Sequence, residues 1–109
     1  LFQLGEQRTA VIEMGTNLPG EIGELARIAE PDVAMITNVG AAHLEGLGSI
    51  EGVATEKGAI FHGLAPKGVA VVNLDDHRVA AQADQAGRST LTFGSHAEAD
   101  IRLLHVAFF

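Results

Sequence analysis

Short apolar runs that alternate with amphipathic segments are the feature that most constrains the fold of this sequence. The apolar runs occupy residues 9–14, 33–36, 69–72 and 89–93, and a stretch with helical spacing lies between each run and the next. This order of strand, helix and strand predicts right-handed crossovers and a parallel sheet covered on both faces. We therefore expect an α/β fold, a mostly parallel sheet flanked by helices.

Turn and capping residues indicate where the helices begin and end. The predicted helices run from Glu21 to Pro31, from Ser49 to Leu64 and from Val79 to Ala86. Ser49 is a candidate N-cap for the second helix, and either Asp75 or Asp76 is a candidate cap for the third, which ends at Gly87. Residues 99–106 alternate loosely, which predicts a fifth strand that leads into a different sheet.

Lys57 interrupts the apolar stripe of the second helix. The stripe consists of Ile50, Val53, Ala54, Ile60, Phe61 and Leu64. At 3.6 residues per turn, position 57 falls inside it. A lysine in this position commonly extends its charged end from the helix edge to solvent. The alternative is a functional amine, because a buried lysine can react with carbon dioxide to form a carbamate, which would be a metal-ligating carboxylate.

Composition excludes several classes of function. The chain has 109 residues and carries 7 Lys and Arg against 14 Asp and Glu, a net charge of -7 that disfavours binding to nucleic acid or to an anionic membrane surface. A hydrophobic fraction of 47% with 19% charged residues is typical of one globular domain. With no cysteine, any metal needs oxygen or imidazole ligands, and a cytoplasmic location is expected.

Polar residues gather where the predicted strands end, which is where parallel sheets bind ligands. They are Glu13, Asn38, His43, Asn73, Asp75 and Asp76. A buried Glu13 would need a cation or hydrogen bonds, so it either binds a metal such as Mg²⁺ or caps the next turn or pairs with Arg27. His43 lies among small residues that leave room for a ligand, although backbone hydrogen bonding is the simpler role. We assign His62, His77, His96 and His105 to structural or solvated positions.

A phosphate-binding loop is absent from the sequence. Neither G-x-x-x-x-G-K-[ST] nor a G-x-G-x-x-G after a strand occurs. The chain also begins at Leu1 without an initiator methionine. We therefore expect a piece of a longer protein, in which missing strands would leave a sheet edge and apolar faces that favour self-association.

Two long stretches resemble the central ATP-binding domain of the Mur ligases. They are EMGTNLPGEIGEL, from Glu13 to Leu25, and NVGAAHLEGLGSIEGVATEKGAIF, from Asn38 to Phe61. Within them, E-M-G-x-N-x-P-G-E-I and H-L-E-G-x-G-S...K-G-x-I-F are typical of the subfamily that adds D-alanyl-D-alanine to UDP-N-acetylmuramoyl-tripeptide. VVNLDD and LTFG continue the match in order. The resemblance covers nearly the whole chain.

The resemblance implies ATP-dependent amide ligation in bacterial cell-wall synthesis. ATP would phosphorylate the tripeptide carboxylate, and the amine of D-alanyl-D-alanine would attack the acyl phosphate and release phosphate. By the same match, Glu13 corresponds to a ligand of the Mg²⁺ between the ATP phosphates and His43 to a ligand of a second Mg²⁺. Lys57 corresponds to the lysine that is carbamylated in some Mur ligases, and Asn38 would help to shape the ligand crevice at the strand ends.

The resemblance also implies a domain organisation. Residues 1–109 would be a truncated, Rossmann-like central domain of the P-loop type, without its phosphate-binding loop and without the N-terminal and C-terminal domains, and inactive by itself. Two alternatives stay open. One is a non-catalytic Rossmann-like binding module that lacks a P-loop, and the other is a domain of another Mur ligase or of a folylpolyglutamate synthetase.

Overall fold

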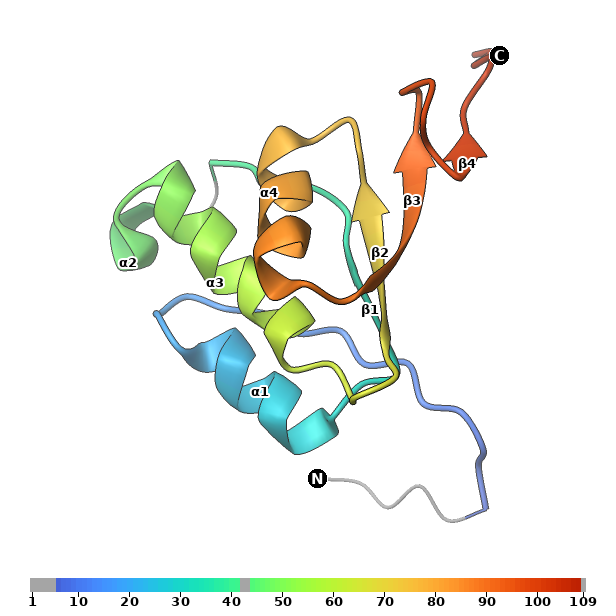
Figure 1. Cartoon of the computed structure of the whole chain (residues 1–109). Coiled ribbons are helices and arrows are strands. Elements are labelled where there is room, and N and C mark those ends of the chain that lie inside the picture. The colour runs from blue at the N-terminus through green and yellow to red at the C-terminus, as the bar shows by residue number, and fades with distance from the viewer. Residues whose placement is uncertain (1–5, 42–43, 109) are drawn as a thin grey trace.

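A computed structural model of the chain describes residues 6–41 and 44–108, and these form a parallel α/β fold (Figure 1). The helices are α1 (Glu21–Ala29), α2 (Leu44–Leu47), α3 (Ile50–His62) and α4 (His77–Ala86). The strands are β1 (Val33–Ile36), β2 (Val69–Asn73), β3 (Ser89–Gly94) and β4 (Ile101–Arg102). The predicted α/β class, its three longer helices and the three strands β1 to β3 are therefore confirmed, and α2 is an addition within a predicted loop.

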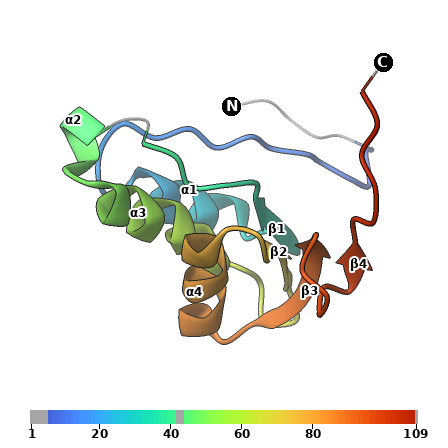
Figure 2. The same cartoon turned by 90° about the horizontal axis from the view of Figure 1, so that it is seen from above.

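The sheet has the strand order β1-β2-β3-β4, and each pair of neighbours is parallel. Each strand thus lies beside the strands that precede and follow it in the sequence. Helix α3 connects β1 to β2, and α4 connects β2 to β3. Because both connections step in the same direction and crossovers of this kind share one hand, both helices lie on the same side of the sheet (Figure 2).

Only one face of the sheet is covered within the described part of the chain. In β1, Ala34 and Ile36 face the helices and are buried, whereas Val33 and Met35 face away and are 61% and 54% exposed. The expectation of helices on both faces is wrong here. A second covered face requires the strand order to reverse direction, and the order of β1 to β4 does not reverse.

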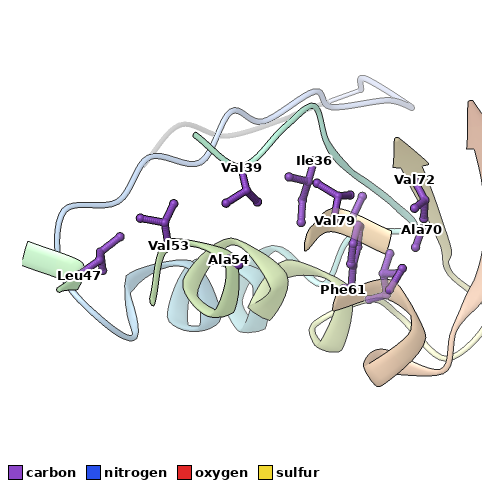
Figure 3. Packing of buried hydrophobic residues seen from close by; sticks show 12 residues of the cluster. Ile36, Val39, Leu47, Val53, Ala54, Phe61, Ala70, Val72 and Val79 are labelled. Carbon is purple, nitrogen blue, oxygen red and sulfur yellow. The ribbon is translucent and has the colours of Figure 1, made fainter. Parts of the chain in front are cut away.

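The hydrophobic core lies between the covered face and helices α3 and α4. Phe61, Val53, Val72 and Val79 are its largest fully buried side chains, and Figure 3 shows them in a cluster that also contains Ile36, Val39, Leu47 and Ala70. Helix α1 packs mainly against α3. Its apolar face is narrower than its sequence spacing predicts, because Ile22 and Ala26 are buried while Leu25 and Ile28 are exposed.

The two outermost predicted strands differ from the structure. Residues 9–14 form no strand, and Val11 in their middle is 97% exposed. An apolar run becomes a strand only when a neighbouring backbone pairs with it, and no described residue pairs with this one. At the other end, residues 99–106 supply only the short strand β4, which pairs with β3 in the same sheet instead of entering another.

The predicted helix ends agree with the structure more closely. Ser49 caps α3, since its Oγ accepts a hydrogen bond from Gly52 N at 3.0 Å. Of the two candidate aspartates, Asp76 caps α4, which begins two residues earlier than predicted. Gly87 ends α4 with a φ of 64°, a conformation that favours glycine. Among the helices described, none has the length and apolar character needed to cross a membrane.

Candidate functional site at the carboxyl ends of the strands

The segment that follows β1 is fixed to the end of β2 by side-chain hydrogen bonds. Asn73 Nδ2 donates to Thr37 O at 2.8 Å, and Val39 N donates to Asp76 Oδ2 at 2.7 Å. The Asn73 side chain also accepts from Asp75 N at 2.9 Å. Of the polar residues predicted to gather at the carboxyl ends of these two strands, Asn73 and Asp76 contact the backbone that follows β1.

Lys57 reaches the same segment from helix α3. Its Nζ donates to the backbone carbonyl of Asn38 at 3.1 Å, and the side chain is half-buried. The lysine in the apolar stripe thus brings its charge to the loop after β1. The side chain of Asn38 itself is exposed. Asn38 and Lys57 were each predicted to be site residues, and the structure brings the two into contact.

Asp76 accepts three hydrogen bonds that fix the backbone in this region. Partial burial alone would raise the pKa of its carboxyl, but hydrogen bonds from the backbone amides of Val39, Val79 and Arg78 outweigh burial and hold the pKa below its usual value. The ionised carboxylate therefore both caps α4 and holds Val39. A single side chain fixes the start of a helix and the loop after a neighbouring strand.

Asp75 performs a similar task between β2 and the turn after β3. Its Oδ2 accepts hydrogen bonds from Ser95 N at 2.8 Å and from Ser95 Oγ at 3.0 Å, and its Oδ1 accepts from His96 N at 3.2 Å. The bond from the Ser95 amide is the main cause that lowers the pKa of Asp75. Three consecutive strand ends are thus linked by carboxylate and amide side chains.

Glu13 stands apart from this hydrogen-bonded group. It is exposed on the irregular segment before Gly15, and its carboxylate has no hydrogen-bond or ion-pair partner in the part of the chain that the structure describes. Both structural alternatives for it are wrong. Arg27 pairs with Glu24 at 3.0 Å, and Glu21 accepts the amides of the turn in place of Glu13.

His43 lies outside the described residues, so its role as a magnesium ligand stays a prediction. Over residues 6–41 and 44–108, no group of three His, Asp or Glu side chains comes together as a metal site would require. The other histidines, at positions 62, 77, 96 and 105, are all exposed, as expected for solvated positions.

Sequence reasoning missed one charged residue, Glu56. It is 6% exposed and lies on α3 next to Lys57. Its spacing could have predicted its burial, because position 56 follows the buried Val53 by three residues and therefore lies on the same side of the helix. Glu56 accepts hydrogen bonds from Thr16, Gly20 and Ile22. Thr16 and Gly20 also belong to the lining of an open depression that is formed by residues 15–21, Glu24 and Leu25.

Comparison with known families gives a consistent result. A model of the Mur ligase middle domain matches residues 2–108. The UDP-N-acetylmuramoyl-tripeptide--D-alanyl-D-alanine ligase of Escherichia coli K12 is 48% identical over 68 residues, which cover 62% of this chain and 15% of the relative. The enzyme of the same name from Buchnera aphidicola is 38% identical over 90 residues, which cover 83% of this chain and 20% of the relative.

Solved structures agree in fold. MurF ligase from Thermotoga maritima in complex with ADP superimposes with a TM-score of 0.70 at 37% identity, over 77% of this chain and 19% of that one. A MurF structure from Acinetobacter baumannii gives a TM-score of 0.69 at 35% identity, over 74% of this chain and 18% of that one. The chain thus spans about a fifth or less of the length of these relatives.

Proposed function

The chain belongs to the Mur ligase family, as a match to its middle domain, and from this premise we propose that it is the central part of an ATP-dependent ligase of peptidoglycan synthesis. The match over residues 2–108 carries the proposal. The phosphate-binding loop and two further domains belong to the rest of the enzyme. The T. maritima relative bound to ADP supports a nucleotide as the ligand of this domain.

We propose D-alanyl-D-alanine and UDP-N-acetylmuramoyl-tripeptide as the substrates, since the relatives named above are ligases of that pair. The reaction is the formation of an amide. ATP transfers its terminal phosphoryl group to the tripeptide carboxylate, and the free amine of D-alanyl-D-alanine displaces phosphate from the acyl phosphate. The products are the pentapeptide, ADP and phosphate.

Magnesium is the proposed ion, with Glu13 as a protein ligand of one Mg²⁺ and His43 as a protein ligand of a second. The carboxylate of Glu13 suits this role because it is exposed and no described side chain engages it. Carboxylate and imidazole are also the ligand types that a cysteine-free chain can offer. When bound, magnesium would neutralise the charge of the phosphates.

The described residues at the strand ends provide a rigid support for this chemistry. Lys57 and Asp76 hold consecutive residues, Asn38 and Val39, by 3.1 Å and 2.7 Å hydrogen bonds. This segment precedes His43 by four positions in the sequence. Its fixed backbone would limit the movement of that side chain relative to the substrates, and orientation of this kind is a large part of catalysis. Lys57 is proposed to be either this fixing amine or, once carbamylated, a further metal ligand.

The test uses the full-length protein that contains this chain. We expect it to convert UDP-N-acetylmuramoyl-tripeptide, D-alanyl-D-alanine and MgATP into the pentapeptide, detected by mass spectrometry together with released phosphate. Glu13→Gln and His43→Ala should abolish product formation and leave the circular dichroism spectrum unchanged, and Glu98→Gln, an exposed carboxylate near the other end of the chain, is the control. A protein that binds nucleotide but forms no pentapeptide would instead be a binding module.

The isolated chain of 109 residues provides a second test. We expect it to hydrolyse no ATP and to form no pentapeptide, because its sequence holds no phosphate-binding loop. Turnover by the purified chain would contradict the proposed domain organisation and would place a complete site within these residues.

A further inference from the structure

Thr16 and Glu56 are the two polar side chains that are buried among the described residues, with exposed fractions of 9% and 6%. They are forty positions apart in the sequence and form a hydrogen bond of 3.2 Å. A buried carboxylate is costly unless several hydrogen bonds compensate for the lost water. The contacts of Glu56 therefore reveal what this charge is stabilising.

The carboxylate of Glu56 holds the segment that leads into α1. Its Oε2 accepts a hydrogen bond from Gly20 N at 2.7 Å, and its Oε1 accepts from Ile22 N at 2.8 Å. The Thr16 hydroxyl lies within reach of both Oε1 and the carbonyl of Leu18, at 3.2 Å and 3.0 Å. Gly20 is the N-cap of α1 and has no side chain to cap the helix. Glu56 supplies that acceptor from another helix.

Neither residue belongs to the motifs that identify the family. Thr16 occupies the first unspecified position of E-M-G-x-N-x-P-G-E-I, and Glu56 lies in the unspecified stretch before K-G-x-I-F. Each nevertheless adjoins a candidate site residue, since Thr16 follows Glu13 by three positions and Glu56 precedes Lys57. Their pairing is a feature of this chain that its family motifs do not contain.

Residues 56 and 57 extend from the same turn of α3 to two different segments. Glu56 holds residues 16–22, and Lys57 holds the backbone of Asn38. Helix α3 itself is anchored in the core through Val53 and Phe61. The segment that follows Glu13 and the segment that contains Asn38 are thus both held by one helix. Loss of the Glu56 contacts would release the first segment alone.

We propose that Glu56 is a positioning residue of the ligase. It fixes the segment after Glu13 so that this carboxylate keeps its place relative to the loop that Lys57 holds. The inference rests on the function proposed above for Glu13. Supporting residues of this type commonly change metal affinity or activity by roughly 10- to 100-fold when they are replaced.

Amide hydrogen exchange tests, without any activity measurement, whether Glu56 holds the segment that leads into α1. In the chain of 109 residues, Glu56→Gln keeps the shape of the side chain but removes one of its two acceptor oxygens. We expect exchange at the amides of Gly20 and Ile22 to become about tenfold faster, as for the loss of a charged hydrogen bond. Amides of β2 should exchange as before. Thr16→Val, which removes only the hydroxyl, should have a smaller effect at the same amides.

Kinetics of the full-length ligase tests the positioning role. For Glu56→Gln we expect the Mg²⁺ concentration at half-maximal rate to rise roughly 10-fold or more, with the KM for D-alanyl-D-alanine unchanged. Glu51→Gln is the matched control, because Glu51 lies on the same helix in an exposed ion pair with Arg78. A general loss of stability would not shift the Mg²⁺ requirement while sparing that KM.

Each outcome has a definite meaning. Unchanged exchange at Gly20 and Ile22 would overturn the inference, because Glu56 would then hold nothing. Faster exchange with a Mg²⁺ requirement equal to that of Glu51→Gln would also overturn it and would leave Glu56 a purely structural residue. If the wild-type protein forms no pentapeptide, the proposed function fails, and the positioning role of Glu56 fails with it even where exchange shows that Glu56 holds the segment.

Discussion

Gly63 and Ala26 approach each other so closely that a Cβ atom placed on Gly63 would lie 2.5 Å from the Cβ of Ala26. Ala26 is fully buried on α1, and Gly63 directly follows α3. The absence of a side chain at position 63 therefore allows the two helices to pack. The closeness also explains how α1, which lies away from the sheet, stays fixed to the rest of the fold.

We expect Gly63→Ala to lower the free energy of unfolding by about 1–3 kcal/mol through overpacking. Ala26→Gly in the same protein should recover part of that loss, because it removes the atom that clashes. Gly23→Ala is the control on the same helix pair. Its new Cβ would lie 3.8 Å from Ala59, an ordinary contact, and the gain in helix propensity should stabilise the protein. Urea unfolding of wild type, Gly63→Ala, Gly63→Ala with Ala26→Gly, and Gly23→Ala checks these expectations.

Asp76 should be sensitive to the loss of either of its two roles. Asp76→Asn keeps an oxygen that caps α4 but places an amide group against Val39 N, and we expect a loss of about 1–3 kcal/mol. Asp76→Ala should lose about 1 kcal/mol more, the usual value of an N-cap. Asp84→Ala, an exposed change on the same helix, should stay within about 0.5 kcal/mol of wild type. Equal stability of all three variants would contradict the bond to Val39.

Acid should weaken the fold through three aspartates. Hydrogen bonds lower the pKa of Asp75 and of Asp100, whose main partner is the Thr92 amide. For Asp76, burial raises the pKa, but hydrogen bonds outweigh it and the pKa is lowered as well. A folded pKa below the unfolded value of about 3.9 gives stabilisation that is complete above that pH and is lost as pH falls through the folded pKa. Urea midpoints should therefore be level at pH 5–6 and fall below about pH 4. The decline should be smaller in Asp76→Asn.

Adjacent residues of β1 should respond in opposite ways because they lie on opposite faces of the sheet. Ile36 is 6% exposed and faces the helices, so Ile36→Ala should cost about 2–5 kcal/mol. Met35 is 54% exposed on the uncovered face, and Met35→Ala should cost about 0.5 kcal/mol or less in the isolated chain. Similar losses for both variants, measured by urea unfolding, would show that both faces are covered in solution.

Elements whose signals are local were predicted well from the sequence. Ser49 and Asp76 cap helices through amides two or three residues away, and Gly87 ends α4 through its own backbone. Residues 33–36 form β1 as predicted. Lys57 was identified as a candidate site residue because it is a charged residue within the apolar stripe of a predicted helix.

Features that depend on distant neighbours were not predictable in the same way. The apolar pattern of residues 9–14 resembles a strand, but it cannot show whether another backbone lies beside them. Periodicity also cannot give the order of the strands, and that order decides how many faces are covered. Glu56 was missed because the amides that it accepts lie 34 and 36 residues away on another part of the chain.

The consecutive order of the strands has a consequence for folding during synthesis. Each strand after β1 pairs with the strand that precedes it in the sequence, so no strand of the described region must wait for one from the far end of the sheet. Parallel sheets usually fold slowly because distant segments must find each other. Here the sheet can grow by stepwise addition from β1 onward, with β1 and α3 as the seed on which later units assemble.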